Sequence, residues 1–150
     1  MLRKTKIMKT KKVLNAMLVL FLLLSGMGCE KETDISILCH TWKFEGFGNS
    51  SNSSFEKAEP SDCEKCYVIK FVTDRTVSGF TASNTFFGEY QINGKKLMIN
   101  NFSETEIFES GNGEKYSRAL SKIASFEIIK NELKLYYNQG RDYLLFYYLN

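Results

Sequence analysis

The chain has 150 residues, a formal net charge of +3 and an aromatic content of 14% with a single proline. This length allows one domain plus a targeting segment, and the composition favours a strand-rich fold over disorder. Residues 1–28 hold six of the 20 basic side chains and no acidic one, so the remainder carries 14 basic and 17 acidic groups. A mildly acidic domain lacks the electrostatic footprint of nucleic-acid binding, and we exclude that class.

The first 28 residues have the layout of a secretory signal, with a basic head, an apolar run over 13–24 and small residues before Cys29. The apolar run is shorter than the roughly 20 residues of a transmembrane helix. Small residues leading into a cysteine resemble a bacterial lipobox, in which the cysteine becomes the acylated N-terminus. The alternative is ordinary secretion with soluble release.

We therefore expect a signal peptide over 1–28, a lipidated tether over 29–37 and a domain over 38–150. Acyl chains such as palmitate on Cys29 would anchor the domain in a membrane. The expected location is the outer membrane of a Gram-negative bacterium. The charged run 30–34 fits a solvated tether, and it also resembles the surface-export signal of Bacteroidota lipoproteins. Beyond the membrane, the expected partner is an unidentified envelope protein.

The domain is expected to begin with a strand over 38–44 that carries the only tryptophan, followed by a flexible loop over 48–54. The stretch 67–100 then alternates apolar and polar residues, which predicts consecutive antiparallel strands. Asn93-Gly94 is the sharpest turn signal, because a two-residue hairpin loop of this composition needs positive φ at both central residues. Gly79 and Gly88 lie inside strands and predict bends or bulges.

Besides the lipobox cysteine, the chain contains Cys39, Cys63 and Cys66, and an odd number permits at most one internal disulfide. A redox Cys-x-x-Cys needs a helix N-terminus, but this pair runs into a strand. A zinc site could combine Cys63 and Cys66 with Cys39 or His40, although only one Cys-x-x-Cys knuckle is present. We favour a structural role, either a disulfide to a neighbouring strand or buried thiols, and expect no metal.

A helix is expected near 113–124, with Asn112 as its N-cap and an apolar face formed by Tyr116, Leu120 and Ile123. Two strands follow, and a last strand over 143–149 is apolar on both faces, so we expect it to be covered on both. Together the elements predict a mainly β (α+β) fold: a curved antiparallel sheet or cracked β-barrel with one packing helix.

The central strands resemble the META domain family, also called HslJ-like. That family has a glycine-containing strand, an Asn-x-Phe-x-Gly-x-Tyr turn and strand, a Leu-x-Ile strand and a threonine. The matching residues here are Gly79, Asn84, Gly88, Tyr90 and Thr105. The resemblance covers roughly residues 38–150 and implies a curved or cracked barrel with a helix. It implies a structural role for the motif, and turn chemistry alone explains Asn84.

Many members of this family carry one cysteine before the asparagine and another shortly after the threonine. Here the matching places are Ser83 and the region 108–109, so both cysteines are absent together. The family has been linked to envelope stress and to motility or virulence traits rather than to a reaction.

Catalysis has little support in the sequence. His40 is the only histidine, and Glu104, Glu106 and Glu109 fall in an expected loop, where solvation explains them. We expect no enzyme and no cofactor, but a non-catalytic envelope lipoprotein with an envelope-stress or structural and interaction role. The alternative is a lipocalin-like carrier of a small apolar ligand, and the many Phe and Tyr residues favour a filled interior instead.

Overall fold

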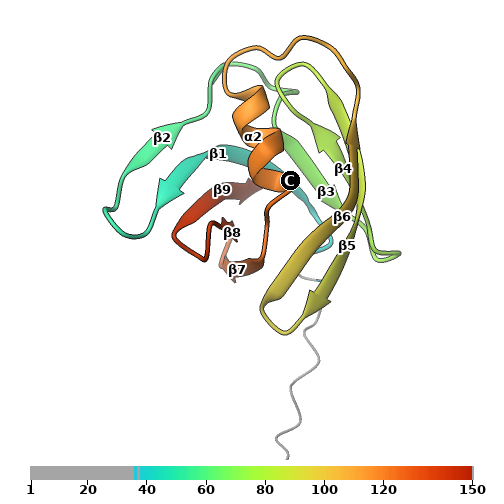
Figure 1. Cartoon of the computed structure of the whole chain (residues 1–150), viewed down its shortest axis with the longest axis vertical. Helices are drawn as coiled ribbons and strands as arrows, with labels where there is room; N and C mark the ends of the chain where they lie inside the picture. Colours follow the sequence, from blue (N-terminus) through green and yellow to red (C-terminus); the bar gives the residue numbers. More distant parts are fainter. Residues whose placement is uncertain (1–35, 37, 150) are drawn as a thin grey trace, which may run out of the picture. The chain divides into compact units, whose positions relative to one another are not determined.

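The structure, a computed structural model, describes residue 36 and residues 38–149. The expected signal peptide, residues 1–28, and Cys29 lie outside the described residues. No helix among the described residues is long and apolar enough to span a membrane. The elements, labelled in Figure 1, are β1 (Thr41–Asn49), β2 (Phe55–Lys57), β3 (Val68–Phe71), β4 (Thr76–Phe80), β5 (Thr85–Asn93), β6 (Lys96–Glu104), α2 (Gly113–Leu120), β7 (Ser125–Ile129), β8 (Glu132–Tyr137) and β9 (Asp142–Tyr148).

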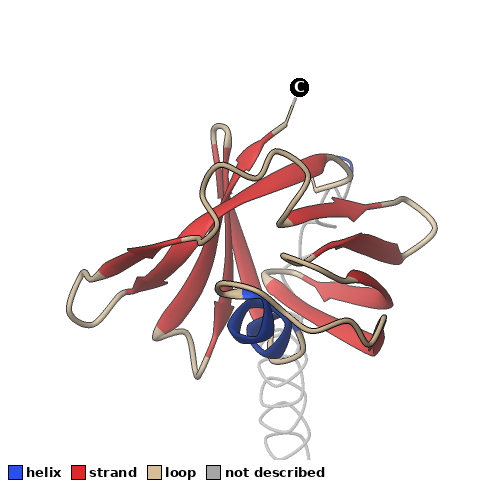
Figure 2. Ribbon diagram, turned by 90° about the horizontal axis from the view of Figure 1, so that it is seen from above, coloured by secondary structure: helices blue, strands red, loops and turns tan. Residues whose placement is uncertain are grey.

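The strands form one curved antiparallel sheet in the order β2-β1-β3-β4-β5-β6-β7-β8-β9, and β9 also pairs with β1. Hydrogen bonding therefore runs in a ring from β1 through β3 to β9 and back. The weakest joint lies between β6 and β7, which pair only at Lys96 and Ser125. There α2 adds a bond, since the Ser117 hydroxyl donates to Glu104 of β6 at 2.7 Å. The expected mainly β fold with one packing helix is confirmed. Seen from above, α2 lies at one side, between two groups of strands (Figure 2).

Aromatic rings fill the interior enclosed by the sheet. Tyr116 of α2 packs against Phe44, Tyr67 and Phe146, with ring centres 4.7, 5.3 and 6.2 Å away. All four rings are at most 2% exposed, as is Trp42, whose Nε1–H donates to a backbone carbonyl at 3.0 Å. Burying each ring stabilises the fold by about 1.5–3 kcal/mol, so α2 is held chiefly by this packing.

The two strand glycines have different roles. The register between β5 and β6 shifts opposite Gly88, where β6 contributes the extra residue and Asn101 adopts a positive φ of 51°, so a bulge is present but lies in β6. Gly79 keeps an unbroken register with both neighbouring strands, so no bulge forms at it. A glycine is needed at position 79 because a larger residue has no room: a Cβ there would lie 2.0 Å from the Val68 carbonyl oxygen and 2.6 Å from the Phe86 ring.

The helix differs from its expectation at both ends. It ends at Leu120, and Asn112 occupies the N-cap position without donating or accepting a side-chain capping bond. Instead, Asn112 Oδ1 accepts from the Glu59 N–H at 2.7 Å and Nδ2 donates to Glu56 at 3.2 Å. The expected cap is wrong because the segment after β2 uses this amide to dock against the start of α2.

The last strand is covered on one face only. Leu144 and Phe146 are fully buried, but Tyr147 and Leu149 are 40% and 44% exposed. The expectation that both faces would be covered is therefore wrong. Both edges of β9 are paired, with β1 and with β8, which satisfies its backbone, and the outer face remains in contact with solvent.

Candidate functional site

A groove of about 750 Å³ lies on the surface between the outer face of α2, the β1–β2 hairpin and the β8–β9 turn. We call it the hairpin groove. Most of its lining side chains are polar, among them Asn49, Glu56, Lys115, Arg118, Lys122, Tyr137, Asn138 and Asp142. A volume of this size falls within the range of small-molecule sites, about 300–1,000 Å³.

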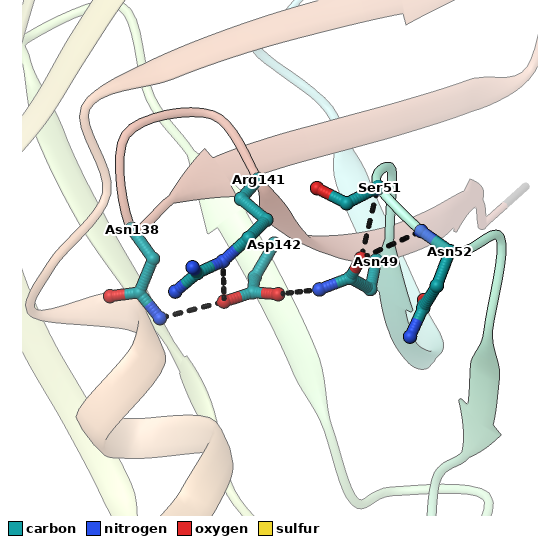
Figure 3. Close-up of polar contacts among 6 residues, drawn as sticks. All are labelled: Asn49, Ser51, Asn52, Asn138, Arg141 and Asp142. Atoms are coloured by element: carbon teal, nitrogen blue, oxygen red, sulfur yellow. Dashed lines mark hydrogen bonds and ion pairs between the residues drawn. The ribbon is translucent and has the colours of Figure 1, made fainter.

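Asp142 contributes a carboxylate to the lining of the groove, and Figure 3 shows it held between Asn49 and Asn138. Its two oxygens accept from Asn138 Nδ2 at 2.7 Å and from Asn49 Nδ2 at 2.5 Å, and Arg141 Nε lies 3.8 Å away. The hydrogen bond from Asn138 is the largest cause that holds the pKa of Asp142 below its ordinary value of 3.8. The carboxylate is therefore ionised at neutral pH.

Asparagine also builds the two turns that carry these groups. Asn49 Oδ1 accepts from the backbone N–H of Ser51 at 2.9 Å and of Asn52 at 3.2 Å, which closes the β1–β2 turn. Asn138 adopts a positive φ of 49° in the β8–β9 turn, a conformation that asparagine tolerates. The asparagine side chains around Asp142 are thus held in place by hydrogen bonds within the protein.

The charges along α2 are mostly paired. Lys115 Nζ lies 2.5 Å from Glu56 Oε2 and 4.0 Å from the centre of the Phe47 ring, so it joins the helix to the hairpin. Arg118 forms an ion pair with Glu114 one turn earlier. Both pairs are solvent-exposed, and each stabilises the fold by at most about 1 kcal/mol.

Among the polar groups that line the groove, the Tyr137 hydroxyl, the Lys122 ammonium and Asn138 Oδ1 have no protein partner within the described residues. The Tyr137 hydroxyl donates and accepts no hydrogen bond there, and Lys122 forms no ion pair. Burial, followed by the carboxylates of Asp142 and Glu56, raises the pKa of Tyr137, so its hydroxyl keeps its proton. The groove therefore offers hydrogen-bonding capacity that the fold itself does not use.

The cysteines and histidine singled out in the sequence do not form one site. Cys63 and Cys66 form a disulfide, and Cys39 is a free thiol whose Sγ lies 3.5 Å from the Tyr90 hydroxyl. His40 packs edge-on against neighbouring aromatic rings. A disulfide removes the two thiolates that a zinc knuckle would need. Among the described residues, no group of three or more His, Cys, Asp or Glu could hold a metal ion.

The disulfide joins two cysteines of the same loop, so the expected disulfide from this loop to a neighbouring strand is wrong. Lys43 of β1 makes that link instead, because its Nζ donates to the carbonyls of Cys63, Glu64 and Cys66 at 2.7, 3.0 and 2.5 Å. Desolvation by burial lowers the pKa of Lys43.

The motif residue Asn84 is 3% exposed and fully bonded. Its Oδ1 accepts from the Thr105 hydroxyl at 2.8 Å and the Ile107 N–H at 2.7 Å. Its Nδ2 donates to the Ile107 carbonyl at 2.7 Å and to Glu109 at 2.6 Å. Every hydrogen-bonding position of the amide is occupied by protein, so Asn84 ties the loop after β6 to the β4–β5 turn.

Two further observations concern this region. The Tyr90 hydroxyl donates to the Val72 carbonyl at 2.6 Å, which fixes β5 against the β3–β4 turn. The Ser83 and Ser110 hydroxyl oxygens lie 3.3 Å apart. Ser83 is one of the places where the resemblance expects a cysteine, and its neighbour across the gap is Ser110, one residue beyond the expected region 108–109.

Sequence reasoning did not single out the hairpin groove. Arg118, Lys122 and Asn138 were not among the candidate site residues, and the stretch 48–54 was expected only as a flexible loop. A signal was present in the clustering of Asn and charged residues at these places. Assembling them into one site requires the pairing of β1 with β9, which no local pattern predicts.

The fold defines a class of protein: a closed ring of antiparallel strands with a filled interior and one packing helix. The chain belongs to the META domain family, whose model matches residues 36–147. A protein of Tannerella forsythia described as "Putative lipoprotein" is 26% identical over 133 residues, covering 86% of this chain and 90% of that protein.

Two solved structures share the fold. The NMR structure of a protein from Burkholderia xenovorans has a TM-score of 0.63 at 19% identity and covers 77% of this chain and 87% of that one. The crystal structure of a DUF4847 family protein from Bacteroides vulgatus has a TM-score of 0.58 at 20% identity, with 73% and 92% covered. At these identities the likeness concerns the fold alone.

Proposed function

We propose that this chain is a non-catalytic lipoprotein of the outer membrane, anchored through acylated Cys29, whose META domain acts as an interaction module of the envelope. The observation that carries the interaction role is that the interior is filled by rings while a polar groove lies open on the outside. The lipobox-like sequence before Cys29 and the lipoprotein name of the Tannerella relative support the anchor.

The filled interior also disfavours a lipocalin-like carrier. Tyr116, Phe44 and Phe146 meet at the centre of the space where such a ligand would lie. Organic extraction of the purified protein followed by mass spectrometry checks this directly. A stoichiometric apolar molecule in the extract would favour the carrier over the interaction module.

The anchor is tested with an alkyne analogue of palmitate in cells that express the full chain. Wild-type protein incorporates the label and sediments with outer membranes, whereas Cys29→Ser does neither. Cys39→Ser is the matched control, because it removes a free thiol without touching the lipobox. The proposal is contradicted if the wild-type protein does not incorporate the label, or if Cys29→Ser still incorporates it. Digestion of intact cells by an added protease then tests surface exposure.

A further inference from the structure

We propose that the hairpin groove is a binding site for a neutral saccharide. This inference deepens the proposed function by naming the ligand class of its exposed site, and it rests on that function. Three properties of the groove carry it: charges that sum to zero, unused hydrogen-bonding groups of both kinds and an exposed aromatic ring in the same lining.

The charges disfavour an ionic ligand. Lys115 is neutralised by Glu56 and Arg118 by Glu114, while Asp142 is bonded to two amides with Arg141 beside it. Lys122 is the remaining basic side chain, so the lining carries three acidic and three basic groups and has no net charge. A charged ligand would face a like charge in this groove. An uncharged polar ligand would not.

The unused groups match hydroxyls. The Tyr137 hydroxyl and the Lys122 ammonium have no protein partner among the described residues, and Asn138 Oδ1 accepts no hydrogen bond there. Asp142 retains lone pairs beyond those that its partners occupy. Since each sugar hydroxyl both donates and accepts, neighbouring hydroxyls can use this mixture of donors and acceptors at once.

The apolar part of the groove suits the carbon face of a sugar ring. Phe55 of β2 lines the groove with 45% of its surface exposed, and the Phe47 ring lies behind Lys115. Exposed aromatic rings present a flat apolar surface next to polar groups, which is the surface that the C–H face of a sugar ring contacts. A purely apolar ligand would instead strand the surrounding polar side chains without partners.

The test uses the purified full-length protein in a zwitterionic detergent, because a sugar-headed detergent would compete for the groove. The protein is applied to an array that carries neutral oligosaccharides, acidic oligosaccharides and peptides, and each hit is titrated in solution. We expect at least one neutral oligosaccharide to bind. Tyr137→Phe and Lys122→Ala should each weaken it about three- to tenfold, the loss of one hydrogen bond.

Neither substitution removes a bond within the described protein, so both variants should fold. Tyr148→Phe, at the other end of β9, and Lys70→Ala, exposed on β3, make the same chemical changes outside the groove and should bind like wild type. The inference is overturned if no neutral oligosaccharide binds, if only acidic ones or peptides bind, or if Tyr137→Phe and Lys122→Ala leave the affinity unchanged. Absence of binding by protein that still acylates at Cys29 defeats this inference alone, whereas loss of acylation defeats the proposed anchor.

Discussion

The Tyr116 hydroxyl offers a sharp test of how the interior is packed. Tyr116 is 0% exposed, and its hydroxyl is the buried side-chain polar atom without a hydrogen-bond partner among the described residues. Burial raises the pKa of this phenol well above its ordinary value, so it stays neutral in the folded protein. Tyr116→Phe removes the oxygen and leaves the ring contacts in place.

The magnitude follows from two opposing effects. A buried hydroxyl without a partner costs about 1–3 kcal/mol of stability. Removing it leaves a space of about 10–15 Å³, roughly one water-sized probe, and at ~24 cal/mol per Å³ this costs about 0.3 kcal/mol. Tyr116→Phe should therefore raise the free energy of unfolding by about 1–2 kcal/mol. In a domain of this size that corresponds to an increase in Tm of roughly 4–8 °C.

Chemical and thermal unfolding followed by circular dichroism measure the effect. The matched control is Tyr90→Phe, since this buried hydroxyl donates to the Val72 carbonyl at 2.6 Å. Its removal should lower the free energy of unfolding by about 0.5–1.5 kcal/mol, because the carbonyl loses this donor and keeps only the Arg75 N–H at 3.1 Å. The two substitutions make the same chemical change with opposite expected signs. An unchanged or reduced stability of Tyr116→Phe would refute the reasoning, because it would mean that the hydroxyl has a partner such as buried water.

Three further predictions concern the sheet, the loop and acid stability. Gly79→Ala should destabilise the domain by about 3 kcal/mol or more, because the added methyl would overlap the Val68 carbonyl; equal denaturation midpoints would contradict this. Ser83→Cys with Ser110→Cys should form a disulfide worth about 2–4 kcal/mol, which free-thiol counting and unfolding under reducing and oxidising conditions check. Because the folded-state pKa of Asp142 lies below 3.8, its contribution to stability is fully present above that pH and is lost as the pH falls below it. Asp142→Asn should show a shallower loss of stability in acid than wild type.

Alternation and turn residues predicted most of the strands, because side-chain period and turn chemistry are local. The β5–β6 hairpin shows where this precision ends. Its loop is Gly94-Lys95 rather than Asn93-Gly94, since Asn93 pairs with Lys96 and only Gly94 has a positive φ, of 57°. Both placements put the glycine in the turn. The register was decided by the pairing of the flanking strands, which a dipeptide signal does not contain.

The candidate site could not be predicted in the same way. Asn49 and Asp142 are 93 positions apart, and they meet because β1 pairs with β9. Residue patterns report which face of an element is apolar, but they do not report which strands close the ring. The Asn112 cap failed for a related reason: a distant backbone N–H, that of Glu59, competed for an amide that local rules assign to the helix.

The pairing of the first long strand with the last has a consequence for how the polypeptide matures. Until residues 142–148 emerge, one edge of β1 and one edge of β8 lack their neighbour. Such open edges recruit other chains, so a nascent molecule that still lacks its last strand is the form most exposed to aggregation. Under the proposed export, this topology favours passage in an extended state, with chaperones bound until the final segment has crossed.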